Sequence, residues 1–130
     1  MGASPDFLRL APGHANRYNG RQILNCKKEF FMNVIIDLCV VPLGVGLSVS
    51  KYVAACHEII EQAGLACELH AYGTNIQGEW DAVFQVVKQC HEKIHAMGAP
   101  RITTTIKVGT RTDREQTMAD KVNSVKEKLG

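Results

Sequence analysis

The chain has 130 residues, which corresponds to one folded domain of common size. Hydrophobic residues make up 45% of it and charged residues 22%, and the formal net charge is +2. This composition is typical of a globular protein, and so small a charge gives no support to a function in binding nucleic acid or anionic membranes. The longest apolar run, residues 34–46, is interrupted by Asp37 and Pro42 and is shorter than the roughly 18 residues that a membrane-spanning helix needs. We therefore expect a soluble protein.

The cysteines indicate a reduced compartment. Their number is odd, and no two of them form a CxxC pair: Cys26, Cys39, Cys56, Cys67 and Cys90. This pattern predicts free thiols in a cytoplasmic protein, with neither a disulfide framework nor a zinc ribbon. Cys39, Cys56 and Cys90 fall on faces that we predict to be buried, where a thiol is more often a small core residue than a nucleophile.

Residues 1–31 differ in character from the rest of the chain, with scattered glycine, proline and asparagine and no sustained apolar period. We predict a poorly ordered N-terminal extension, followed by a single domain over residues 32–130. Three arginines in the extension would suit a transit peptide: Arg9, Arg17 and Arg21. Asp6 and Glu29, together with the lack of an amphipathic stripe, count against that hypothesis.

The first predicted element is a strand over residues 33–41, NVIIDLCVV, in which apolar residues occupy most positions on both faces. Such a strand needs a covering surface on each side. Residues 42–50 follow as a glycine-rich turn, where Ser48 or Ser50 is available to cap a helix. Apolar residues then recur at helical spacing as far as Gly64, which predicts a helix that ends there.

Four further elements and a closing helix complete the predicted domain. We predict a short strand over residues 65–74, a turn and a brief strand over residues 74–80, a helix over residues 81–98 and a β-branched strand over residues 101–110. Asp113 is placed to cap the closing helix. The apolar stripe of that helix consists of Met118, Val122, Val125 and Leu129.

The resulting order, β-α-β-β-α-β with an additional C-terminal helix, is that of an α+β ferredoxin-like sandwich. An internal repeat supports this prediction. Residues 56–74 and residues 90–110 both begin with CHE, contain a glycine at the end of a helix, and finish with Gly-Thr. We infer that the two halves of the domain are related by a pseudo-twofold axis.

Residues 91–95, HEKIH, match the HExxH pattern of zinc metallopeptidases, in which two histidines bind the metal and the glutamate activates water. In the first copy of the repeat, however, Glu61 stands where the second histidine would be. His95 also lies about 90° from the apolar stripe of its helix, and no histidine follows it in the sequence. We therefore interpret His91 and His95 as part of a solvated helix flank. Adventitious metal binding and a metal- or thiol-dependent enzyme are the alternatives.

The first candidate binding loop is residues 42–50, PLGVGLSVS, between a strand end and a helix start. Gly44 and Gly46 would let backbone N–H groups come close to a polar ligand, and the hydroxyl of Ser48 would add a hydrogen-bonding group. The pattern is neither GxGxxG nor a Walker loop. An ordinary strand-to-helix turn with a serine cap is the alternative.

The second candidate loop is residues 73–80, GTNIQGEW. Gly73 allows a tight turn, and Thr74 offers a hydroxyl. Glu79 supplies a hydrogen-bond acceptor, and Trp80 supplies a surface on which a ring can stack. The alternative is a β-turn, followed by a glutamate that favours the positive end of a helix dipole and a tryptophan that belongs to the core.

Four motifs occur in order along the chain: V-P-L-G-x-G-x-S-V-S-x-Y-V, G-T-x-I-x-G-E-W-D-x-V-F-x-V-V-K, R-I-x-T-x-I-K and a D-R…K-V-x-S-V tail. Together they resemble the YkoF-like thiamine-binding protein family, from about residue 32 to the C-terminus. The resemblance implies a ferredoxin-like subunit whose sheets join in a dimer, with two dimers forming a homotetramer. It also implies binding of a small molecule, thiamine or its hydroxymethylpyrimidine part, without catalysis, cofactor or metal.

Seven residues match the family's binding motifs: Gly44, Gly46, Ser48, Gly73, Thr74, Glu79 and Trp80. Two departures stand beside them. Gln77 occupies a position where the family more often has an acid, and residues 70–72, HAY, precede the Gly-Thr pair where smaller or aliphatic residues are usual. Loss of the acid would weaken recognition of a cation or favour the neutral pyrimidine. A structural or regulatory homo-oligomer with a vestigial pocket is the alternative function.

Overall fold

A computed structural model describes residues 31–130 of the chain. The predictions made for residues 1–30, including the transit-peptide hypothesis, lie outside the described residues. Residues 32–130 form one compact unit. None of the helices in this part of the chain is both long and apolar enough to cross a membrane.

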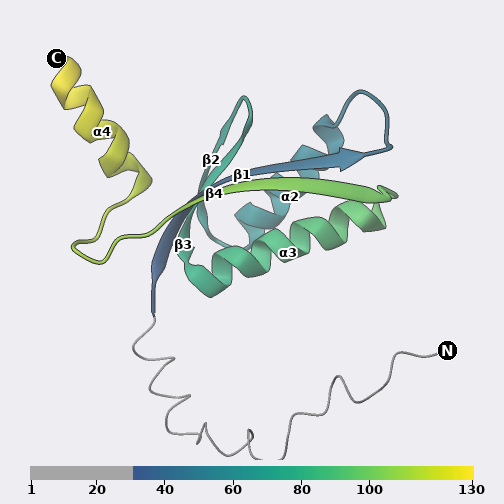
Figure 1. The fold of residues 1–130 in the computed structure, drawn as a ribbon, viewed down its shortest axis with the longest axis horizontal. Coiled ribbons are helices and arrows are strands. Elements are labelled where there is room, and N and C mark those ends of the chain that lie inside the picture. The colour runs from purple at the N-terminus through teal and green to yellow at the C-terminus, as the bar shows by residue number, and fades with distance from the viewer. Residues whose placement is uncertain (1–30) are drawn as a thin grey trace, which may run out of the picture. The chain divides into compact units, whose positions relative to one another are not determined.

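The described part of the chain folds as a four-stranded sheet with three helices (Figure 1). In chain order the elements are β1 (Asn33–Leu43), α2 (Ser50–Gln62), β2 (Ala66–His70), β3 (Gly73–Glu79), α3 (Trp80–Ala96), β4 (Arg101–Gly109) and α4 (Met118–Leu129). Neighbouring strands are antiparallel, and their order across the sheet is β2-β3-β1-β4. The α+β class and the predicted β-α-β-β-α-β order with an additional C-terminal helix are therefore confirmed.

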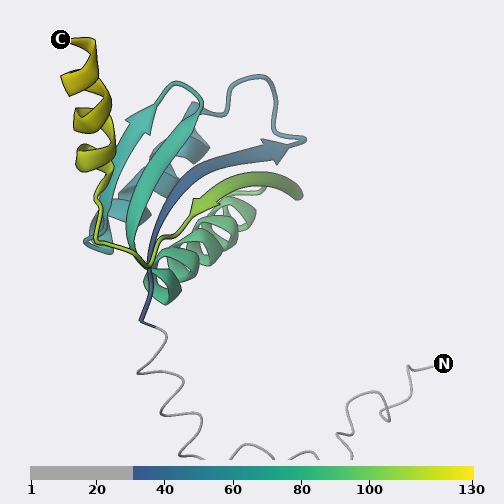
Figure 2. The same cartoon turned by 60° about the vertical axis from the view of Figure 1, so that its left-hand side comes forward.

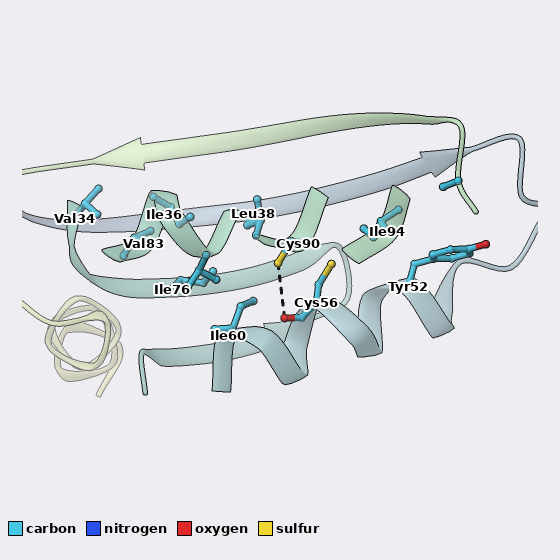
Figure 3. Packing of buried hydrophobic residues seen from close by; sticks show 12 residues of the cluster. Val34, Ile36, Leu38, Tyr52, Cys56, Ile60, Ile76, Val83, Cys90 and Ile94 are labelled. Carbon is cyan, nitrogen blue, oxygen red and sulfur yellow. Dashed lines mark hydrogen bonds between the residues drawn. The ribbon is translucent and has the colours of Figure 1, made fainter. Parts of the chain in front are cut away.

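The two faces of the sheet differ in what lies over them. Figure 2 shows α2 and α3 together on one face. Alternate residues of β1 point to that face and are buried there: Val34, Ile36 and Leu38. They pack against the buried side chains of α2 and α3 and against Ile76 of β3 (Figure 3). The intervening residues of β1, from Ile35 to Val41, point to the opposite face, which we call the uncovered face because neither α2 nor α3 lies over it.

The two copies of the internal repeat have similar helix ends and meet in the core. Each helix ends at a glycine in the left-handed region, Gly64 with φ of 73° and Gly98 with φ of 103°. The first residues of the two CHE motifs meet in the core, where the thiol of Cys90 donates to the backbone carbonyl oxygen of Cys56 over 3.8 Å (Figure 3). This contact is consistent with a pseudo-twofold axis between the halves, which stays a prediction.

Three local predictions were wrong, two of them before α3 and one at α4. The turn between the second and third strands lies at residues 71–72, so that β3 begins at Gly73 and is a full strand. The residue that precedes α2 is Val49, whose side chain makes no capping bond, while the hydroxyls of Ser48 and Ser50 lie 3.3 Å apart and interact with each other. The Ser48 hydroxyl therefore interacts with another side chain and not with the backbone N–H groups at the start of α2.

The closing helix also begins differently from the prediction. Thr117, and not Asp113, caps α4: the Thr117 hydroxyl accepts from the N–H of Asp120, and the Asp120 carboxylate accepts from the N–H of Thr117. This bond lowers the pKa of Asp120. Asp113 instead pairs with Arg111, which lowers the Asp113 pKa to about 2. The predicted apolar stripe of α4 is present but exposed, with Val122 at 48%, Val125 at 57% and Leu129 at 80%.

Candidate ligand-binding site

The seven predicted site residues lie at three separate places along β1. Glu79 is paired with Asn33 at the start of that strand, and Thr74 is paired with Leu38 near its middle. Gly44 directly follows the end of the strand. At about 3.3 Å per residue, the distance from Asn33 to Gly44 is on the order of 35 Å. Within one subunit these residues therefore do not surround a single point, and a site that includes all of them needs more than one copy of the chain.

The first loop has the backbone conformation that its glycines allow. Gly44 has φ of 79° and Gly46 has φ of 96°, in a region that other residues rarely adopt. A side chain at Gly44 would also lie 3.3 Å from the ring of Pro100. The loop is solvent-exposed around Leu47 and Ser48. Its binding role stays a prediction, and its glycines are already explained by the turn itself.

Three residues of the second loop have structural roles. Thr74 is 6% exposed and lies on the face covered by the helices. The Glu79 carboxylate accepts from the N–H of Ala82 over 3.0 Å and so caps α3. The ring of Trp80 lies 4.6 Å from that of Phe84, centroid to centroid. Ligand binding by these residues stays a prediction, since the contacts already account for a hydroxyl, an acid and an indole at these positions.

Gly73 lies beneath a hydrogen bond that crosses the uncovered face. The Nε2 atom of His70, on the edge strand β2, is 2.7 Å from Oδ1 of Asp37, on the central strand β1. The imidazole reaches over β3 at the position of Gly73, which is paired with His70. A Cβ atom at Gly73 would lie 2.5 Å from the carbonyl oxygen of Leu38 and 3.1 Å from Oδ1 of Asp37. Glycine is therefore required here by the close approach of β1 and of the Asp37 carboxylate.

The hydrogen bonds of His70 define its tautomer. The backbone N–H of Tyr72 donates to Nδ1 of His70 over 3.3 Å, so that Nδ1 is the acceptor of the ring. The neutral imidazole then carries its proton on Nε2 and donates it to Oδ1 of Asp37. Among residues 31–130, the hydrogen bonds to the Asp37 side chain involve only Oδ1. The second oxygen, Oδ2, is left as a hydrogen-bond acceptor on the uncovered face.

Asp37 is part of a row of polar residues that runs across all four strands. The register pairs Asp37 with Asn75 on one side and with Lys107 on the other, and pairs Asn75 in turn with Glu68. We call Glu68, Asn75, Asp37 and Lys107 the polar row. Directly paired residues point to the same face, so that all four lie on the uncovered face. The side-chain amide of Asn75 donates to the carbonyl oxygen of Ile36 over a long 3.5 Å, which leaves its own oxygen available.

Sequence reasoning missed the polar row, although one signal was present. Asp37 is the single charged residue in the apolar strand NVIIDLCVV, and an acid in the middle of a strand is unusual enough to mark a special position. Its partners could not be found in the same way. His70, Asn75 and Lys107 stand 33, 38 and 70 residues further along the chain, and only the register brings them beside Asp37.

Both histidines of the HExxH pattern are hydrogen-bonded within the subunit. Nε2 of His91 lies 2.6 Å from the hydroxyl of Thr104, and Nδ1 of His95 lies 2.8 Å from the carbonyl oxygen of Ala99. His95 is exposed, as its angular position predicted, and His91 is partly buried. The two ring centroids are 6.4 Å apart. In the described part of the chain, no group of three or more potential ligand side chains lies around them or elsewhere.

The thiols differ in position. Cys56 and Cys90 are buried, which confirms their prediction as core residues. Their hydrogen bond, together with burial, raises the pKa of Cys90 and keeps it protonated. Burial and the nearby charge of Glu61 raise the pKa of Cys67. The prediction for Cys39 was wrong: it lies two residues after Asp37 on the uncovered face and is partly exposed, because that face of β1 has no helix over it.

The profile of the family described as thiamine-binding protein matches residues 36–126. The chain belongs to this family. The UPF0045 protein sll0230 of Synechocystis sp. is 66% identical to it over 94 residues, which are 72% of this chain and 78% of that protein. The UPF0045 protein ECM15 of Eremothecium gossypii is 42% identical over 99 residues, 75% of this chain and 94% of that protein. The resemblance seen in the motifs is thus confirmed.

Solved structures share the fold of this member of the thiamine-binding protein family. The hypothetical protein MJ1052 of Methanocaldococcus jannaschii superimposes with a TM-score of 0.68 at 30% identity, over 73% of this chain and 97% of that chain. A Thermotoga maritima protein, assigned provisionally to thiamine biosynthesis or salvage, superimposes with a TM-score of 0.62 over 72% of this chain and 98% of that chain. At 19% identity, the second likeness bears on the fold alone.

The close approach at Gly73 leads to a stability prediction. Gly73→Ala should lower the free energy of unfolding by about 1–3 kcal/mol, because the added Cβ forces backbone apart. Gly109→Ala is the matched control, since Gly109 is also in a strand without a positive φ and its nearest non-neighbouring atom would be 3.8 Å away. Urea unfolding of both variants gives the comparison. Equal stability of the two variants would show that β1 and β3 are not in this contact.

Proposed function

We propose that this protein binds thiamine, or its hydroxymethylpyrimidine part, and does not catalyse a reaction on it. The observation that carries the proposal is the match to the thiamine-binding protein family over residues 36–126. The chemistry of the uncovered face supports it, because the polar row presents donors and acceptors on one face of the sheet. An aminopyrimidine offers alternating donors and acceptors to such groups, and a cationic thiazolium would favour acidic neighbours.

The alternative of a metal- or thiol-dependent enzyme finds less support. His91 and His95 each use a ring nitrogen in a hydrogen bond to their own subunit. The thiols of Cys67 and Cys90 have raised pKa values, so that they are poor nucleophiles at neutral pH. The hydrogen bond with Cys90 lowers the pKa of Cys56, but Cys56 is buried in the core and out of reach of a substrate. The uncovered face carries one partly exposed thiol, Cys39, and the groups of the polar row, which can bind and orient a ligand.

Gln77 has a partner that bears on ligand preference. Its side-chain oxygen accepts from the N–H of Met118, at the start of α4, over 2.6 Å. The amide thus holds the C-terminal helix beside the uncovered face instead of offering a charge to a ligand. This contact is consistent with recognition of the neutral pyrimidine in preference to the cationic ring.

We further propose that copies of the chain assemble into dimers and that two dimers form a homotetramer. The uncovered face supports this, because Val41 and Leu43 leave apolar surface beside the polar row. The exposed stripe of α4 supports it as well. A second copy would enclose a ligand bound to the uncovered face. The free thiols fit a reduced compartment, and we propose a cytoplasmic location.

Calorimetric titration tests the proposed function. Thiamine or hydroxymethylpyrimidine should give saturable heat with the full chain, and absence of heat with both compounds would contradict the proposal. Thr74→Val, which removes a hydroxyl and keeps the shape, should leave binding unchanged, because Thr74 is buried on the face covered by the helices and the proposed ligand position is on the uncovered face. Thr110→Val, at an exposed position after β4, is the control. Equal affinity of the two variants would assign Thr74 to the core alone.

Sedimentation tests the proposed assembly. The protein should have a mass four times that of one chain, and Val125→Glu should shift it to smaller species because the charge would have to be buried in the interface. Asn123→Glu, which adds the same charge on an exposed residue of α4 outside the apolar stripe, should leave the mass unchanged. A monomeric wild-type protein would contradict the assembly. A tetramer that gives no heat with either compound would favour the homo-oligomer with a vestigial pocket.

A further inference from the structure

We infer that Asp37 is the residue that recognises the amino group of the ligand's pyrimidine ring, with Asn75 beside it; the inference rests on the proposed function. It concerns residues that the family motifs did not point to. The subsite consists of Asp37, held by His70, and the amide of Asn75, all on the uncovered face. The chemical class that it fits is a ring with an exocyclic amino group next to a ring nitrogen.

The sheet and His70 hold Asp37 in one position. It is on β1, which has a hydrogen-bonded neighbour strand on each side, so that its backbone is held more firmly than that of an edge strand. Its carboxylate is positioned by the Nε2–H of His70 at 2.7 Å and by the close contact over Gly73. A group held in one orientation before the ligand arrives costs less entropy to use in binding.

Asp37 also has a carboxylate oxygen that is free to accept a hydrogen bond from a ligand. His70 occupies Oδ1, and in the described part of the chain no hydrogen bond or ion pair involves Oδ2. Lys107 is paired with Asp37 in the register, yet the ion pairs of the described residues do not include it. Oδ2 is therefore a charged acceptor without a competing cation in contact, and hydrogen bonds to such an acceptor are about twice as strong as neutral ones.

The hydrogen-bonding groups of an aminopyrimidine match those of Asp37 and Asn75. A 4-aminopyrimidine donates from its amino group, which suits Oδ2 of Asp37, and accepts at the adjacent ring nitrogen, which suits the side-chain amide of Asn75. The present bond of that amide, to the carbonyl oxygen of Ile36, is long at 3.5 Å, and its second hydrogen is not used in it. An analogue with an oxo group in place of the amino group would put two acceptors face to face, which opposes binding.

The test compares thiamine with oxythiamine, in which an oxo group replaces the amino group. We expect the wild-type protein to bind thiamine at least tenfold more tightly, measured by calorimetric titration. Asp37→Asn should weaken thiamine binding at least tenfold and abolish the preference. Its amide oxygen can still accept from Nε2–H of His70, so the link between β2 and β1 is kept, while an N–H₂ donor replaces the acceptor at Oδ2.

Asp81→Asn, which removes an exposed carboxylate in the first turn of α3, is the control and should keep the wild-type preference. Melting temperatures of both variants show whether the fold is kept. Thiamine binding by the wild type with an unchanged preference in Asp37→Asn would overturn this inference and leave the proposed function standing. If Asp37→Asn does not fold, the wild-type protein still tests the inference. Equal affinity of the wild type for thiamine and oxythiamine would also overturn it. Absence of binding to either compound would overturn both.

Discussion

The interior position of β1 is the constraint on which the rest of the subunit depends. The strand pairs with β3 along one edge and with β4 along the other, so that its side chains have only two directions available. One set, from Val34 to Leu38, packs under α2 and α3 and forms the centre of the core. The same alternation sends Asp37 to the middle of the uncovered face. The alternation of side chains along β1 thus explains both the burial of one set of residues and the exposure of the other on the uncovered face.

The uncovered face shows how a missing side chain can have a functional consequence. Because Gly73 has no Cβ, β1 comes close to β3, and the ring of His70 can pass over β3 to reach Asp37. The resulting bond ties the edge strand to the central strand and also orients a carboxylate toward solvent. In the binding mode that we propose, stability and ligand recognition share the same residues, which would account for a polar network on a strand whose other residues are mostly apolar.

The HExxH pattern illustrates why spacing alone does not identify a metal site. Two histidines one turn apart share a helix flank in any helix, whatever their partners. Here the carbonyl oxygen of Ala99 and the hydroxyl of Thr104 supply those partners. The match with the first copy of the repeat, where Glu61 replaces the second histidine, already indicated that the CHE element is a feature of the helix and not a metal site. The structure adds that the cysteines of the two CHE elements are in contact between α2 and α3.

The sequence by itself determined the order of the elements, the glycines that end α2 and α3, the alternation of β1 and the family, because these depend on residues close together in the chain or on ordered motifs. Tertiary structure decided the rest. It separated Gly44, Thr74 and Glu79 along β1, replaced Asp113 by Thr117 as the cap of α4, and joined His70 to Asp37. The physical reason is strand register: a period of two tells which face a side chain takes, and only the paired strands determine which residue lies opposite it.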